Sequence, residues 1–377
     1  KTWNLIQYLA RRHQVTLVSF VRGDQHAEAE VLRRVCRAVY TVPMQRSIWR
    51  DAAALARSLV SGQPWTMVRD ARREMRALLE HLLQTQHFDI LHADQLNMAQ
   101  YAALGNGAPR VLDAHNALWV LYKRLAETLP ARNPLKWVYA RDWKLLKRYE
   151  GEVCRSFGGV LAVSAEDARA LQEAAAAPFP LQVVPIAIDA DAMSPVQRLP
   201  QASHILHIGT MFWPPNVDGM LWFLNEVFPR IQKVRPEVQC DVVGSRPPAE
   251  ILAWRGKGVN VTGYVVAPAP YLRQAGVMIV PLRAGGGMRV KILNALSQEL
   301  PLVSTTIGAE GIALEDGVHA LIADTPAEFA AAVLRLLEDR SLAARLGRNG
   351  RRLILEKYDY RRACAPVETL YQQARGN

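Results

Sequence analysis

Apolar and polar residues alternate with two different periods along the first half of the chain. Short apolar runs predict strands, and longer stretches with an apolar residue every three or four positions predict the helices between them. Strands that alternate with helices indicate parallel βαβ units. The strands predicted in this half are Val15–Phe20, Ala38–Val42, Ile90–Ala93, Arg110–Asp113, Gly159–Val163 and Leu181–Val184.

Prolines recur between residues 178 and 200, and a second alternating series follows them. We therefore expect an N-terminal Rossmann-like domain over residues 1–190, a C-terminal one over 191–357, and a helix over 358–377 that crosses back to the first domain. The strands of the second series are His204–Ile208, Gln239–Val243, Val259–Thr262, Val277–Val280, Leu302–Ser304 and Ala320–Ala323.

The start of the chain has the pattern of an amphipathic helix, Thr2–His13, which leads into the strand Val15–Phe20. A doubly wound domain ordinarily begins with a strand, and the loop after that strand lies at the ligand crevice. We therefore expect a first strand and its loop to be missing ahead of Lys1.

Composition narrows the functional classes. The chain has 377 residues, 50% of them hydrophobic, and a net charge of +11. Its cations are scattered, so no nucleic-acid partner is expected, and no apolar run is long enough for a transmembrane helix. The four cysteines form no CxxC pair, which argues against zinc and disulfides and favours the reducing cytoplasm.

A long basic and aromatic segment, Pro134–Arg155, offers one route to a membrane. Cations and a tryptophan on one helix favour peripheral contact with the anionic inner face of a membrane. The alternative is a helix whose charges are simply solvated. The residues behind this expectation are Trp137, Lys144, Lys147, Arg148 and Arg155.

The strongest chemical signal is a glycine-rich turn between a predicted strand and a helix. Gly285, Gly286 and Gly287 are consecutive, and Arg289 and Lys291 follow at the helix start. Glycine allows close backbone approach, and a helix start presents free N–H groups, so phosphate is the natural ligand. The alternative is a plain βα turn with solvated cations.

Five segments in order resemble a family-4 retaining glycosyltransferase (group 1) of the GT-B fold, with two Rossmann-like domains facing across a cleft. The glycine segment is similar to a subgroup with a GGG-x-R-x-K loop. Where the family often has two glutamates with seven residues between them, this chain has Gly286 and Asn294, which leaves its sugar contacts open. The segments are His207–Asn216, Asp241–Gly244, Val261–Val265, Gly285–Asn294 and Pro301–Gly311.

The resemblance implies transfer of a sugar from a nucleotide-diphosphate sugar to a glycan, lipid-linked or small-molecule acceptor, in polysaccharide or glycoconjugate biosynthesis. It implies no cofactor and no metal, because cations and N–H groups meet the diphosphate. We expect front-face transfer, with Arg289 and Lys291 stabilising the leaving group. The donor-binding residues are Gly209, Asn216, Gly285, Gly286, Gly287, Asn294 and Glu310.

In the N-terminal half, polar residues follow predicted strands at the edge where α/β sheets bind ligands. His115 resembles the family histidine near the transferred sugar and is the third catalytic candidate. His92, Asp113 and Asn116 are acceptor-side candidates. Without the resemblance, a loop histidine paired with Asp113 is the preferred explanation of His115.

Two other functions remain open. A nucleotide-sugar epimerase would share the fold but needs several acid and base groups around the sugar. A non-catalytic partner that binds nucleotide sugar is the second alternative, favoured by the missing glutamate pair.

Overall fold

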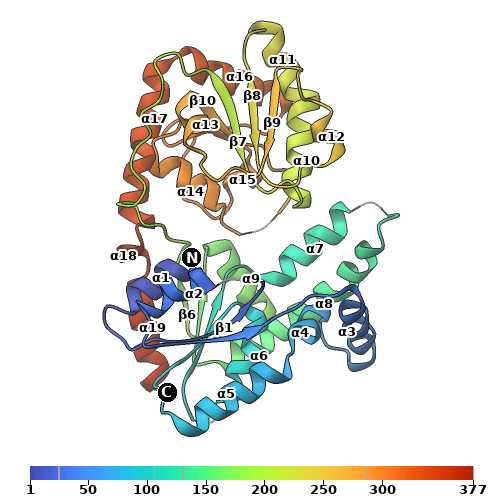
Figure 1. The fold of residues 1–377 in the computed structure, drawn as a ribbon, viewed down its shortest axis with the longest axis vertical. Helices are drawn as coiled ribbons and strands as arrows, with labels where there is room; N and C mark the ends of the chain where they lie inside the picture. The colour runs from blue at the N-terminus through green and yellow to red at the C-terminus, as the bar shows by residue number, and fades with distance from the viewer. Residues whose placement is uncertain (24–25, 106, 130, 286, 377) are drawn as a thin grey trace. The chain divides into compact units, whose positions relative to one another are not determined.

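The computed structural model describes residues 1–23, 26–105, 107–129, 131–285 and 287–376. The chain divides into two compact units (Figure 1): unit 1 comprises Lys1–Ala187 and Tyr360–Asn377, and unit 2 comprises Ile188–Asp359. Every strand ladder among the described residues is parallel, which confirms the predicted α/β class.

The strands of unit 1 form two sheets, β1-β2 and β3-β4-β5-β6. All six predicted strands are present, but they do not join into one continuous sheet. They are β1 (Thr16–Val21), β2 (Ala38–Pro43), β3 (Leu91–Asp94), β4 (Arg110–Ala114), β5 (Gly159–Ala162) and β6 (Leu181–Val183).

Helices of unit 1 cover these sheets, and all four residues of β5 are buried. The first two helices after β2 are separate because Gly62, in the left-handed conformation, ends α3, and Pro64 is the N-cap residue of α4. The helices are α1 (Thr2–Leu9), α2 (His26–Arg33), α3 (Ile48–Ser61), α4 (Trp65–Asp70), α5 (Arg73–Thr85), α6 (Ala99–Ala102), α7 (Leu118–Thr128), α8 (Pro134–Ser156), α9 (Ala165–Ala175), α18 (Tyr360–Ala363) and α19 (Pro366–Gly376), with a 3₁₀ turn at Leu96–Met98.

Unit 2 contains one six-stranded sheet of order β12-β11-β10-β7-β8-β9. Its central strand β10 is buried at every position, as its unbroken apolar sequence predicts for a parallel sheet covered on both faces. The strands are β7 (His204–Ile208), β8 (Cys240–Val243), β9 (Val259–Gly263), β10 (Ala275–Val280), β11 (Leu302–Ser304) and β12 (Leu321–Ile322).

The core of unit 2 is aromatic and fully covered around Phe223, Phe228 and Phe329. Thr325 caps α16 by accepting from the backbone N–H of Glu328. The helices are α10 (Pro214–Trp222), α11 (Phe228–Val234), α12 (Ala249–Leu252), α13 (Ala269–Gln274), α14 (Val290–Ser297), α15 (Thr306–Ala309), α16 (Pro326–Glu338) and α17 (Arg340–Leu353), with π-helical turns at Phe223–Val227 and Ile354–Tyr358.

Candidate functional site

Unit 2 has a switch in strand order between β7 and β10. These two strands are adjacent and parallel, and the chain continues from β7 on one side of the sheet and returns to β10 on the other. Open α/β sheets bind ligands at the carboxyl edge beside such a switch. Gly209 directly follows β7, and the glycine loop follows β10, so both predicted donor segments lie at this edge.

Polar side chains connect the two loops. Asn216, near the start of α10, donates from Nδ2 to the Thr210 carbonyl at 2.9 Å. Lys291, in the first turn of α14, donates from Nζ to Asn216 Oδ1 at 3.0 Å. The structure therefore brings together two of the predicted donor-binding residues, Gly209 and Asn216, and the predicted catalytic residue Lys291.

Gly209 is required by this close approach. A Cβ atom on residue 209 would lie 2.6 Å from Lys291 Nζ, 3.1 Å from His207 Nε2 and 3.2 Å from Asn216 Nδ2. Any side chain at residue 209 would therefore collide with Lys291 and crowd His207 and Asn216. Lys291 and Asn216 carry N–H donors, which suit an anionic ligand beside them.

The sequence did not single out His207. It is fully buried in β7, and its Nδ1 lies 3.1 Å from the Ile279 carbonyl, which can only accept. In the neutral ring Nδ1 therefore carries the proton, and Nε2 has no hydrogen-bond partner among the described residues. Burial and the charge of Lys291 keep the pKa of His207 well below its ordinary value.

Burial, and then the charge of Arg289, lower the pKa of Lys291 to about 7. An ammonium that has lost its hydration favours a nearby anion. Arg289, the N-cap residue of α14, donates from Nη1 to the Gly287 carbonyl at 2.5 Å. The two predicted catalytic cations are thus electrostatically coupled at one helix start.

Two glycines of the loop have backbone angles that other residues avoid, with φ of 128° at Gly285 and 74° at Gly287. Gly286, the third predicted donor glycine, lies outside the described residues. Asn294 follows Lys291 on α14, and its Oδ1 is buried with no hydrogen-bond partner among the described residues. An unsatisfied amide oxygen at this position suits a ligand hydroxyl.

Glu310, the last predicted donor-binding residue, is the C-cap residue of α15, after β11. The sequence places it after a strand, but a short helix intervenes. Arg246, in the loop after β8, stacks over the ring of Phe212, in the loop after β7, with its Cζ 4.0 Å from the ring centroid; the sequence did not single out this pair.

Unit 1 has its own polar cluster at the ends of β3 and β4. His115 Nε2 lies 2.7 Å from Asp94 Oδ1 and 3.8 Å from Asp113 Oδ2. His92 Nε2 is also 3.8 Å from Asp113 Oδ2, and its Nδ1 lies 2.7 Å from the Tyr371 hydroxyl. The predicted residues His92, Asp113 and His115 are therefore brought together.

Asp113 is fully buried, and Lys1 forms an ion pair with its Oδ1. Burial raises the pKa of Asp113, but Lys1, His92 and His115 outweigh burial and hold it below its ordinary value. One ligand atom each from His92, Asp94 and Asp113 lies within 4.8 Å of the others, a spacing that a cation would accept. The Lys1 ammonium, however, already neutralises Asp113.

The loop that carries His115 is fixed by two buried carboxylates. Asp167 accepts from the backbone N–H of Ala117 at 2.8 Å. Glu150 of α8 accepts from the N–H groups of Leu118 and Trp119, at 2.8 and 2.9 Å, and so caps α7. Asn116, the last acceptor-side candidate, is partly exposed in the same loop.

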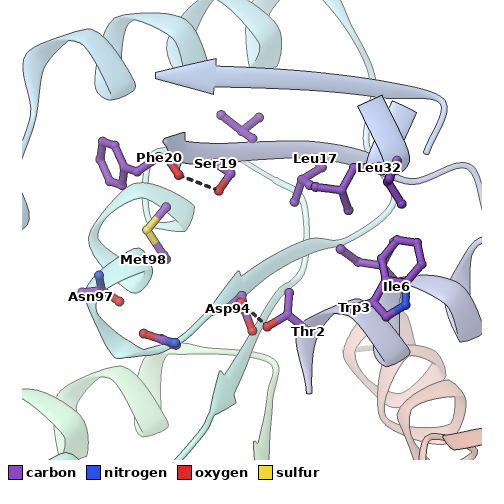
Figure 2. Close-up of a pocket in the computed structure, with 13 residues that line it drawn as sticks. Thr2, Trp3, Ile6, Leu17, Ser19, Phe20, Leu32, Asp94, Asn97 and Met98 are labelled. Carbon is purple, nitrogen blue, oxygen red and sulfur yellow. Dashed lines mark hydrogen bonds between the residues drawn. The ribbon is translucent and has the colours of Figure 1, made fainter. Parts of the chain in front are cut away.

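A pocket of about 540 Å³ opens beside this cluster (Figure 2). Asp94 forms one polar end, where it accepts from the Thr2 hydroxyl at 2.9 Å. Gln95, also in the lining, lies 3.4 Å from His115 Nδ1. The remaining lining is largely apolar and comes from α1 and β1, among others Trp3, Ile6, Leu17 and Phe20.

The described part of the chain contains no helix long and apolar enough to cross a bilayer. All four cysteines, Cys36, Cys154, Cys240 and Cys364, are buried free thiols.

Comparisons with known proteins cover both units. A family model described as "Glycosyltransferase Family 4" matches residues 2–192, and one described as "Glycosyl transferases group 1" matches residues 202–339. The "Uncharacterized 44.6 kDa protein in cps region" of Klebsiella pneumoniae is 26% identical over 176 residues, 44% of this chain. That match spans 45% of the relative's length.

Solved structures match along nearly the whole chain. Sucrose-phosphate synthase from Thermosynechococcus elongatus has a TM-score of 0.66 at 13% identity, over 96% of this chain and 99% of that one. Anabaena Alr3699/HepE in complex with UDP has a TM-score of 0.66 at 14% identity, over 98% and 93%. These similarities establish the fold and confirm the predicted GT-B class.

Proposed function

The chain belongs to glycosyltransferase family 4, and from this premise we propose that it transfers a sugar from a nucleotide-diphosphate sugar to a hydroxyl-bearing acceptor. The similar Anabaena protein is described in complex with UDP, which makes a uridine diphosphate sugar the first donor to test. The proposal rests most heavily on Lys291 Nζ and Asn216 Nδ2, the two N–H donors beside Gly209.

That arrangement suits the diphosphate of the donor. Lys291 and Arg289 supply charge, and the start of α14 supplies backbone N–H groups. An ammonium with a pKa of about 7 becomes fully charged when a diphosphate binds beside it. We propose that these groups make a metal unnecessary for donor binding.

In the proposed reaction the bond from the anomeric carbon to the diphosphate oxygen breaks, and the acceptor oxygen bonds to that carbon from the same face. The acceptor proton passes to the departing phosphate oxygen, so the anomeric configuration is retained. Lys291 and Arg289 stabilise the charge that develops on the diphosphate. No protein carboxylate enters a covalent intermediate in this scheme.

The cluster of unit 1 suits a different partner. Asp94 and His115 offer acceptors and a donor for hydroxyl groups, and the apolar pocket beside them suits the less polar part of an acceptor. We propose that His115 hydrogen-bonds the transferred sugar and that Asp94, His92 and Asp113 hold its orientation.

The acceptor is proposed to be a growing glycan or a lipid-linked glycan. The Klebsiella relative is described as a protein of the cps region, which favours polysaccharide biosynthesis. A lipid-linked acceptor also requires peripheral contact with a membrane, which we include in this proposal.

The test is a transfer assay with a panel of UDP- and GDP-sugars and lipid-linked acceptors. We expect release of nucleoside diphosphate only when an acceptor is present, and a product whose anomeric configuration matches the donor by NMR. Conversion of the donor without an acceptor would instead identify an epimerase. Absence of turnover, together with no thermal stabilisation by any nucleotide, would reject the proposal.

A further inference from the structure

The outer face of α3 is apolar although it faces solvent. Ile48 is 86% exposed, Trp49 85%, Leu59 61% and Val60 91%. Leu59 follows Ile48, and Val60 follows Trp49, by about three helical turns, so all four lie on one side of the helix. A contiguous exposed apolar surface of this kind marks an interaction site.

The inner face holds α3 in this orientation. Ala54 and Ser58 are buried, with exposed fractions of 1% and 0%. Arg141 of α8 donates to the Ser58 carbonyl at 2.7 Å and to its hydroxyl at 3.0 Å. Turning the apolar face inward would break these bonds, so its exposure is a property of the fold.

Helix α8 lies next to α3. Figure 1 shows α3 beside α8, and the Arg141–Ser58 bonds join them. We call the outward apolar surface of α3 at this helix pair the α3–α8 face; it comprises Ile48, Trp49, Leu59 and Val60.

Arginines border the α3–α8 face. Arg50 and Arg57 are both exposed and, at seven residues apart, lie on the same edge of the apolar stripe. Neither forms an ion pair with a carboxylate of the described residues. Their charge, on a chain of net charge +11, complements an anionic surface.

We propose that the α3–α8 face binds an anionic lipid bilayer, with Trp49 and Val60 in the boundary between headgroups and acyl chains and with Arg50 and Arg57 on lipid phosphates. Tryptophan and arginine around an apolar helix face have the chemistry of a bilayer interface. Each arginine adds attraction to anionic headgroups.

The basic residues of α8 serve other contacts. Lys147 pairs with Glu173, Arg148 with Glu152, and Arg155 donates to the Ala175 carbonyl. The membrane contact therefore moves from that predicted basic set to α3. This inference deepens the peripheral contact proposed above, and vesicle binding requires no catalysis, so its failure would leave the transfer proposal intact.

The experiment is flotation of the full chain with two kinds of vesicle, phosphatidylcholine alone and phosphatidylcholine with phosphatidylglycerol. We expect binding to the anionic vesicles that weakens in high salt. The double variant W49S/V60S should bind at least about tenfold more weakly, and R50Q/R57Q should lose the preference for phosphatidylglycerol.

The matched control is Val234→Ser, which removes another exposed apolar side chain, 60% exposed, from unit 2. It should float like the wild type, and circular dichroism should show that all variants fold. Equal binding of W49S/V60S and wild type, or no binding at all, would overturn the proposal. So would a dimer in sedimentation that W49S/V60S dissociates, because the face would then join two copies.

Discussion

Each unit has a polar cluster at the carboxyl edge of parallel strands, but the charged groups of the two clusters have opposite sign. In unit 2, Lys291 and Arg289 meet at the start of α14, beside the end of β7. In unit 1, Asp94 and Asp113 gather with histidines at the ends of β3 and β4. One architecture therefore offers a site for an anion in one unit and a site for hydroxyl groups in the other.

The pKa directions extend this comparison. Burial lowers the pKa of Lys291 to about 7, because contacts within the protein do not make up for the hydration that its ammonium loses. The pKa of Asp113 lies below its ordinary value because Lys1 and the histidines compensate its charge. Unit 2 is thus arranged for an external anion, whereas unit 1 already balances its own charges.

The largest effect should come from removing the cation of unit 2. Lys291→Ala should lower turnover about a hundredfold, because one charged donor to the leaving diphosphate is lost. The measurement is steady-state kinetics with saturating acceptor. Lys233→Ala removes an exposed lysine from the same unit and should leave turnover unchanged. Near-wild-type turnover in Lys291→Ala would show that the positive charge of unit 2 does not serve the reaction.

The next effect concerns the rigidity of the unit 1 edge. Glu150→Gln should lower the free energy of unfolding by about 2 kcal/mol, because an amide NH₂ cannot accept from both N–H groups of α7. Burial raises the folded-state pKa of Glu150 to about 8, from 4.5. The stability from its bound proton is therefore present below pH 4.5 and lost as pH rises through about 8.

Urea unfolding from about pH 5 to about pH 8 measures both parts of this prediction. The wild type should lose stability across this range relative to Glu150→Gln, which has no titrating group there. Glu152→Gln, on the exposed side of α8, is the matched control. Parallel pH profiles would show that Glu150 takes up no proton on folding, and equal stability of the wild type and Glu150→Gln would show that the cap does not hold the His115 loop.

The fold was largely predictable because its strands are short apolar runs. Each of the predicted strands is present, and the strands pair in parallel because helices connect them. The split of unit 1 into two sheets could not be predicted, because strand neighbours depend on packing rather than on local pattern.

The candidate site was predictable where it rests on local sequence. Glycines and cations at a strand–helix turn identified Gly285, Arg289 and Lys291. His207 was missed because it lies inside an apolar strand, and only the pairing of β7 with β10 brings it to Lys291. Glu150 was missed for a similar reason. Nothing in its local sequence distinguishes it from other carboxylates on helices, and only the fold brings it to the start of α7.

A smaller effect should separate the roles of the two units. His115→Asn should lower turnover about tenfold, through loss of one hydrogen bond near the sugar, and leave the affinity for UDP unchanged. Turnover and UDP calorimetry on the same preparation provide the test. His87→Asn, an exposed histidine of unit 1, should change neither quantity. A loss of UDP affinity in His115→Asn would mean that donor binding is not confined to unit 2 residues.

The smallest effect is a pH dependence of nucleotide affinity. Before binding, Lys291 is half protonated near pH 7, and a diphosphate beside it raises its pKa, so binding takes up a proton above that pH. The affinity for UDP should fall roughly fivefold between about pH 7.5 and about pH 8.5. Calorimetry in two buffers of different ionisation enthalpy should show proton uptake at the higher pH. In Lys291→Met, which keeps the length of the side chain without its charge, both the pH dependence and the proton uptake should vanish. If the pH dependence and the proton uptake persisted, another group would be responsible for them. Lys291 would then be charged before the donor binds, as the carboxylates of unit 1 are charged without a ligand.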